Sequence, residues 1–220
     1  MEAPICYIVG AGEDHGERFS VEPGDLLIAA DGGYARLKRA GLQPDLLVGD
    51  LDSLQYAPEA TPLLRLPKVK DVTDTWAAVE EGIRRGYRKF SFYGCTGGRF
   101  DHTLANLQTL AMLAEKGLEG ALYEGRQVIT AVSGNRRFGA EYHGYLSVFS
   151  LTDSCEGVSL KGLKYELENA ALSNRFPLGV SNEFLGKEAE VTIEKGIALL
   201  VYSVANEMAP SDEGAVSAAD

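Results

Sequence analysis

The sequence predicts an α/β protein: an N-terminal parallel sheet with helices, followed by a C-terminal antiparallel β-sandwich. Up to about residue 120, short apolar runs alternate with amphipathic helical segments, the pattern of parallel strands joined by crossover helices. From about Ala121 the pattern changes to short strands separated by glycines, which is typical of a sandwich. With 220 residues, 45% of them hydrophobic, the chain can bury a sizeable core in one large domain or two small ones.

The first half is predicted to be Rossmann-like because its strands come first in each unit and run into Gly or Asp. The predicted buried strands are Ile5–Val9, Leu26–Ala30, Leu46–Val48 and Phe90–Tyr93. Two helices are predicted from apolar residues that recur at helical spacing, over Asp74–Arg85 and His102–Lys116. We expect this α/β domain to cover residues 1–120.

The second half is predicted to be an all-β domain over residues 121–205. Val191 and Ile193 alternate with charged or polar neighbours, as in a half-buried strand. Ile197–Val204 is almost wholly apolar, as in a strand buried on both faces. Residues 206–220, rich in Ala, Ser and acidic residues, are predicted to form a flexible acidic tail.

Charge and cysteine usage exclude several classes of function. The net charge is −11, so the body of the protein repels phosphate backbones and anionic membranes, and we expect neither as a partner. Cys6, Cys95 and Cys155 form no CxxC pair, which predicts buried reduced thiols and not a disulfide framework or a zinc site. Without a signal peptide or a membrane-spanning stretch, the chain is expected to be cytoplasmic.

Aspartates at predicted strand ends are the densest chemical signal: Asp31, Asp45, Asp50 and Asp52. In open α/β sheets, ligands bind beyond the carboxyl ends of the strands. Asp50 and Asp52 are two residues apart, so in an extended segment both carboxylates point to one side and repel unless a cation lies between them. Hard oxygen ligands of this kind suit Mg²⁺. The alternative, for any one of them, is a turn or helix-capping role.

Two further segments add to this signal. Asp74 lies in the first turn of a predicted helix and could complete a metal site, whereas Asp71 or Thr73 is better explained as the helix N-cap. The glycine-rich turn from Gly94 to His102 resembles an anion cradle, with backbone N–H groups and the Arg99 guanidinium as donors. His102 itself could simply cap or pack at the helix start. Together these residues indicate phosphoryl-type transfer from a nucleotide, with the acceptor left open.

Short motifs in a specific order resemble the thiamine pyrophosphokinases over nearly the whole chain. They are Asp31-Gly32-Gly33, Pro44-Asp45, Val48-Gly49-Asp50-Leu51-Asp52-Ser53, Asp71-x-Thr73-Asp74, Gly97-Gly98-Arg99-x-Asp101-His102 and Ser181-Asn182-Glu183. The resemblance implies a homodimer with sites shared between subunits. It also implies the reaction of ATP with thiamine to give thiamine diphosphate and AMP.

The resemblance also implies roles for individual residues. Asp50, Asp52 and Asp74 would hold Mg²⁺ on the ATP phosphates, and Arg99 with Asp101 would lie at the transferring group. The cofactor-binding crevice would be lined by Asp31, Gly32, Gly33, Thr96, Gly97, Gly98, Arg99 and His102. Ser181 and Asn182 would contact thiamine. The alternatives are a pyrophosphokinase acting on another hydroxymethyl heterocycle, such as a pterin, and a non-catalytic nucleotide or thiamine sensor.

Overall fold

The N-terminal half is a parallel sheet in the computed structural model, which describes residues 3–50, 61–66 and 71–203. Its strands lie in the order β4-β3-β2-β1-β5-β6, each parallel to its neighbours. They are β1 (Ile5–Val9), β2 (Leu26–Ala30), β3 (Leu46–Gly49), β4 (Leu63–Arg65), β5 (Lys89–Tyr93) and β6 (Glu119–Glu124). The four predicted strands are confirmed to within a residue at each end.

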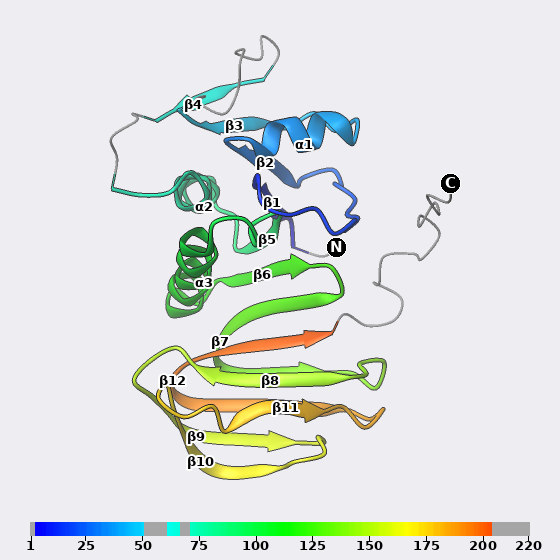
Figure 1. Ribbon diagram of the computed structural model, residues 1–220, viewed down its shortest axis with the longest axis vertical. Coiled ribbons are helices and arrows are strands. Elements are labelled where there is room, and N and C mark those ends of the chain that lie inside the picture. Colours follow the sequence, from blue (N-terminus) through cyan, green and yellow to red (C-terminus); the bar gives the residue numbers. More distant parts are fainter. Residues whose placement is uncertain (1–2, 51–60, 67–70, 204–220) are drawn as a thin grey trace, which may run out of the picture.

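Three helices lie beside this parallel half (Figure 1): α1 (Gly33–Arg39), α2 (Asp74–Arg84) and α3 (Phe100–Glu115). Ala78 and Val79 of α2 and Leu110 of α3 join a core with the even-numbered residues of β1 and β5, such as Ile8 and Phe90. Leu37 of α1 packs with odd-numbered residues such as Tyr7, so α1 covers the opposite face. Because side chains alternate along a strand, these strands are buried on both faces.

The C-terminal half is antiparallel. Its strands are β7 (Gln127–Phe138), β8 (Tyr145–Ser150), β9 (Ser154–Lys161), β10 (Leu167–Ser173), β11 (Gly179–Glu183) and β12 (Ala189–Ser203). A register shift between Ile193 and Ala198 divides β12: its first part pairs with β9 and its second part with β8. Side chains of these strands, including Phe138, Leu146 and Val191, form a core of their own.

The large mixed α/β sheet agrees with the predicted fold class. The two halves share one hydrogen-bonded path, because β6 pairs in parallel with β5 and antiparallel with β7 (Figure 1). A separate sandwich domain beginning at residue 121 stays a prediction, since that position lies within β6. The predicted acidic tail lies outside the described residues.

The three cysteines are free and buried, as the sequence predicts. Burial raises the pKa of both Cys6 and Cys95 to about 12, so these two thiols are protonated at neutral pH. Among the helices of the described ranges, none is long and apolar enough to cross a membrane.

A buried carboxylate in α2 makes stability depend on pH. Glu81 is 9% exposed and accepts hydrogen bonds from the Arg84 and Arg85 guanidinium groups at 2.7 Å. The bonds from Arg84, with those from Arg85, lower the pKa of Glu81 from 4.5 to about 2. A lowered folded-state pKa stabilises the protein above the unfolded pKa, and this contribution is lost as the pH falls from about 4.5 to 2.

We therefore expect Glu81→Gln to lower the unfolding free energy at pH 6 by about 2 kcal/mol, after allowing for the solvent around Arg84. The difference from the wild type should shrink steadily toward pH 2. Denaturant unfolding at several pH values measures it, and a difference that is the same at pH 6 and pH 3 would contradict the assigned pKa.

Candidate active site

The carboxyl ends of the parallel strands bring several predicted site residues to one edge. Asp31 follows β2 and Asp50 follows β3, and these strands pair directly. The glycine-rich turn follows β5, which pairs with β1. The predicted placement of Asp31 and Asp50 at the carboxyl ends of neighbouring strands is therefore confirmed, and their contact with a ligand stays a prediction. Asp52 lies outside the described residues.

Asp45 does not belong to this edge, and its inclusion in the aspartate set is wrong. It precedes β3 and so lies at the amino end of the strand. Its Oδ2 accepts a hydrogen bond from the Leu27 N–H at 2.8 Å, and its own N–H donates to the Leu27 carbonyl at 2.9 Å. Asp45 therefore extends the pairing of β2 and β3 by one residue.

Asp31 turns away from its strand with a strained backbone. Its φ is +47°, in the left-handed region that non-glycine residues rarely adopt. Its N–H still donates to the Val48 carbonyl at 2.8 Å, so the turn begins directly after the last strand bond. Within the described ranges, the other non-glycine residues with positive φ are Asn169 and Ser181, and Ser181 is also a predicted site residue. Strain of this kind tends to gather at functional sites.

A cleft of about 340 Å³ unites most of the predicted nucleotide-binding residues. The predicted residues that line it are Asp31, Asp74, Thr96, Gly97, Gly98, Arg99 and His102. Asp50 and Asp101 are not in its lining, although Asp50 follows Gly49, whose backbone lies against Asp31. Gly32 and Gly33 also lie outside the lining. Gly32 is the N-cap of α1, and Gly33 is its first residue. A Cβ at Gly33 would collide with the Val9 carbonyl oxygen, so this glycine lets α1 approach β1.

A second hollow, of about 400 Å³, lies at the amino ends of β5 and β6 beside Lys89 and Arg136. It contains none of the predicted site residues. The cleft at the carboxyl edge is the stronger candidate site, because carboxylates, the glycine-rich turn and Arg99 line it.

The glycine-rich turn is held from both sides. On one side, the loop after β1 runs beside it: the Gly12 N–H donates to the Gly94 carbonyl at 2.7 Å and the Glu13 N–H to the Thr96 carbonyl at 3.0 Å. On the other side, the buried Asn106 of α3 donates from Nδ2 to the Cys95 carbonyl at 2.6 Å. Asn106 was not among the predicted site residues; it lies on the buried face of α3 with Leu110 and Leu113.

Arg99 and Asp101 form a two-pronged ion pair at the mouth of the cleft. Arg99 Nε donates to Asp101 Oδ1 at 3.2 Å and Nη2 to Oδ2 at 2.6 Å. The guanidinium holds the pKa of the Asp101 carboxyl below its ordinary value, so Asp101 is ionised at neutral pH. Both side chains are exposed, and a bound phosphate group could replace Asp101 on the guanidinium fork.

Asp74 does not cap α2, because its neighbour Thr73 does. Thr73 is the N-cap of α2, and its hydroxyl accepts the Trp76 N–H at 3.1 Å. The prediction that Thr73 or Asp71 serves as the cap is confirmed for Thr73. Asp74, in the first turn, lines the cleft together with the glycine-rich turn. A carboxylate there also interacts favourably with the helix dipole.

Ser181 and Asn182 lie on β11, away from this cleft. The Asn182 side chain is buried, and it links β11 to the segment before β10. Its Oδ1 accepts the N–H groups of Tyr165 and Glu183, both at 2.9 Å, and its Nδ2 donates to the Tyr165 carbonyl at 2.7 Å. Asn182 thus shapes the backbone around Ser181, whose side chain is exposed. The contact of Ser181 and Asn182 with thiamine stays a prediction.

The two halves of the chain match two domain models of one family. Residues 20–121 match the thiamin pyrophosphokinase catalytic domain, and residues 135–198 match the thiamin pyrophosphokinase vitamin B1 binding domain. The chain belongs to the thiamin pyrophosphokinase family. The catalytic-domain match contains Asp31, Asp50, Asp74 and the glycine-rich turn, and the second match contains Ser181 and Asn182.

Relatives of this family resemble the chain over most of its length. The thiamine pyrophosphokinase of Bacillus subtilis is 27% identical over 186 residues, which are 81% of this chain and 87% of that protein. Thiamin pyrophosphokinase 1 of Caenorhabditis elegans is 25% identical over 80% of this chain and 77% of its own. The crystal structure of the Geobacillus thermodenitrificans thiamin pyrophosphokinase superposes with a TM-score of 0.80 at 25% identity, covering 93% of this chain and 99% of that one.

Proposed function

We propose that the protein is a thiamine pyrophosphokinase, which transfers the pyrophosphoryl group of ATP to the hydroxyl of thiamine and releases AMP. The observation that carries this proposal is the pairing of two matched regions: a catalytic domain that contains the cleft and a vitamin B1 binding domain that contains the β11 segment. The thiamine-binding match favours thiamine over a pterin as the acceptor.

In the proposed reaction, the thiamine hydroxyl oxygen bonds to the β-phosphorus of ATP while the bond from that phosphorus to the oxygen of the α-phosphate breaks. AMP leaves, and the hydroxyl proton passes to solvent. In such transfers positioning and charge neutralisation supply most of the catalysis. The N–H group of Gly97 would bind a phosphate oxygen, and the Arg99 guanidinium, which Asp101 holds beside the cleft until a phosphate replaces that carboxylate, would bind another.

The donors at this edge fit a divalent cation, and we assign Mg²⁺ to Asp50, Asp52 and Asp74. All three are carboxylates, and those in the described ranges, Asp50 and Asp74, belong to the same sheet edge. Within those ranges, which exclude Asp52, no three His, Cys, Asp or Glu side chains are close enough to hold an ion. Mg²⁺ needs no such cluster, because it takes one or two carboxylates and binds phosphates and water besides. When bound, it would neutralise charge on the triphosphate.

Product analysis tests the proposal. Incubation with ATP, Mg²⁺ and thiamine should yield AMP and thiamine diphosphate in equal amounts. Stoichiometric ADP would overturn the pyrophosphoryl transfer, and activity with a hydroxymethylpterin but not thiamine would identify the rival acceptor. A sensor would bind ATP or thiamine and release no AMP.

We expect lysine at position 99 to lower activity about as much as alanine does. We expect Arg99→Lys and Arg99→Ala each to lower kcat/KM for ATP by about tenfold, because lysine keeps the charge but loses the planar fork that matches phosphate oxygens. Steady-state kinetics with ATP varied measures this. A lysine variant with nearly full activity would mean that only the charge matters at this position.

We also propose that the protein works as a homodimer with shared sites. Five steps between neighbouring strands separate β5 from β11, through β6, β7, β12 and β8. At about 4.8 Å per step this is roughly 24 Å along the sheet, more than a thiamine molecule can span. The β11 of a second copy could instead lie over the cleft.

Exposed apolar side chains support this arrangement. One set surrounds β11, which pairs only with β8 among the described strands: Tyr145, Tyr165, Phe176, Leu178, Val180 and Leu185. A smaller set, Phe100 and Leu104, lies on the first turns of α3 beside Arg99. Exposed apolar clusters beside an edge strand are typical of interaction surfaces. Contact between the β11 set of one subunit and the α3 set of the other would bring Ser181 to the partner's cleft.

A further inference from the structure

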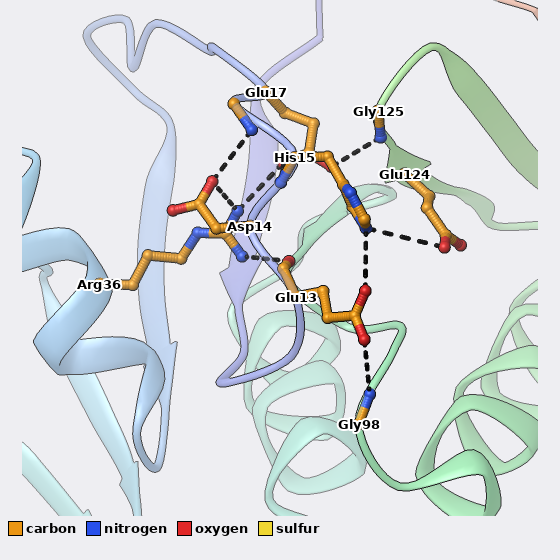
Figure 2. A network of polar contacts seen from close by, with 9 residues as sticks. Glu13, Asp14, His15, Glu17, Arg36, Gly98, Glu124 and Gly125 are labelled. Carbon is orange, nitrogen blue, oxygen red and sulfur yellow. Dashed lines mark hydrogen bonds and ion pairs between the residues drawn. The ribbon is translucent and has the colours of Figure 1, made fainter. Parts of the chain in front are cut away.

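A polar network outside the cleft centres on Arg36 of α1 (Figure 2). The Arg36 side chain is 12% exposed, and its guanidinium donates to three acceptors of the loop after β1. Nη1 donates to the Glu13 carbonyl at 3.0 Å, and Nη2 donates to Asp14 Oδ1 at 2.7 Å and to Glu17 Oε2 at 3.0 Å. Three acceptors spaced over five residues fix the path of this loop on α1.

The loop is anchored a second time through Glu17. Its side chain is 4% exposed, and its other carboxylate oxygen accepts the Gly125 N–H at 2.8 Å (Figure 2). Gly125 lies in the turn between β6 and β7, so Glu17 connects α1 to the start of the C-terminal half. A buried carboxylate needs a charged partner, and Arg36 is that partner.

From this anchored loop, Glu13 reaches the cleft. Its N–H donates to the Thr96 carbonyl at 3.0 Å, and its Oε1 accepts the Gly98 N–H at 3.3 Å (Figure 2). Thr96 and Gly98 line the cleft, whereas Arg36 does not. Arg36 also lies directly against Gly94, where a Cβ would collide with its Nη1. The contacts therefore run from Arg36, through Glu13, to the two cleft residues.

We propose that Arg36 is a positioning residue for ATP, which holds the glycine-rich turn in its phosphate-binding conformation through Glu13. The proposal rests on the function proposed above. Its physical basis is that hydrogen-bond donors serve a phosphate only when they are fixed in place beforehand, and small displacements lower their effect. On the loop side, the Glu13 side chain anchors the Gly94–Arg99 turn at the Gly98 N–H, and Asn106 anchors it from α3.

The test measures ATP and thiamine separately. We expect Arg36→Ala to raise the KM for ATP about tenfold and to leave the KM for thiamine within about twofold, since thiamine is assigned to β11. Arg36→Lys keeps the charge beside Glu17 but not the fork, so it should fold normally and give an intermediate KM for ATP. Arg39→Ala, on an exposed residue of the same helix, should match the wild type in both constants.

A merely structural role would give a different result. Glu81→Gln removes a buried carboxylate–arginine cluster elsewhere, so it should lower Tm while leaving the KM for ATP unchanged. If Arg36→Ala behaves like Glu81→Gln, with a lower Tm and an unchanged KM for ATP in the folded protein, the proposal is wrong. If Arg36→Ala does not fold, Arg36→Lys decides: a wild-type KM for ATP contradicts the proposal.

Direct ATP binding separates this proposal from the proposed function. Calorimetry with ATP and Mg²⁺ in the absence of thiamine should give a Kd about tenfold weaker for Arg36→Ala than for the wild type. If the wild-type protein binds ATP but forms no AMP, the proposed pyrophosphokinase function is wrong. The ratio of the two Kd values for ATP, Arg36→Ala over wild type, then still decides the role of Arg36. Equal Kd values, or no ATP binding by the wild type, would overturn the positioning role.

Discussion

Asp74→Asn and Asp50→Asn are each expected to lower kcat/KM by at least ~10², the usual cost of removing one strong electrostatic stabiliser from an active site. Asparagine keeps the size of the side chain but loses the charge that a divalent cation requires. The Mg²⁺ concentration for half-maximal activity should rise as well, because each variant leaves fewer carboxylates for the ion. Initial rates over a Mg²⁺ titration measure both effects.

Stability should not fall with activity in these variants. Asp74 and Asp50 belong to the same edge as Asp31, and removing one of these like charges lowers the repulsion among them. Asp45→Asn is the matched control: it lies at the opposite end of β3, and asparagine can still accept the Leu27 N–H. We expect its activity to stay within about twofold of the wild type. A metal-free Tm that falls by many degrees in Asp74→Asn would show that this carboxylate is structural.

The sequence predicted those parts of the fold that have strong local signals. The buried strands of the first half were predictable because both of their faces are apolar, as in Ile5–Val9 and Leu26–Ala30. Helix α1 was missed because it has only seven residues, begins with Gly33 and has another glycine, Gly32, as its N-cap. Strand β4 was missed because its three residues are half-buried or exposed, so they show no apolar pattern.

The candidate site was predicted where a motif coincides with a strand end. Asp31, Asp74 and Arg99 share one cleft because parallel strands end at the same edge. Asp45 was wrongly grouped with the strand-end aspartates, because β3 begins only at Leu46 and Asp45 therefore lies at its amino end. Arg36 and Glu17 could not be predicted, because their contact joins residues 19 apart through a loop without regular structure.

The largest gain of activity should come from mixing two inactive proteins, Asp74→Asn and Ser181→Leu. The bulky leucine replaces the exposed Ser181 side chain on β11 and should block the thiamine pocket. Ser181 is preferable to Asn182, because the Asn182 side chain holds the backbone of Tyr165 and its replacement would disturb the local fold. Each variant alone should be almost inactive while keeping a cooperative thermal transition.

In a shared-site dimer, a mixed pair has one pocket with both defects and one pocket with neither. If the two variants are unfolded and refolded together, half of the dimers are mixed at random, so about a quarter of the wild-type activity should return. Mixing Asp74→Asn with Asp50→Asn is the control, because both changes lie in the same half and every pocket keeps one defect. Affinity tags on one variant report the fraction of mixed dimers. Mixed dimers that form without regaining activity would mean that each chain builds its thiamine pocket alone.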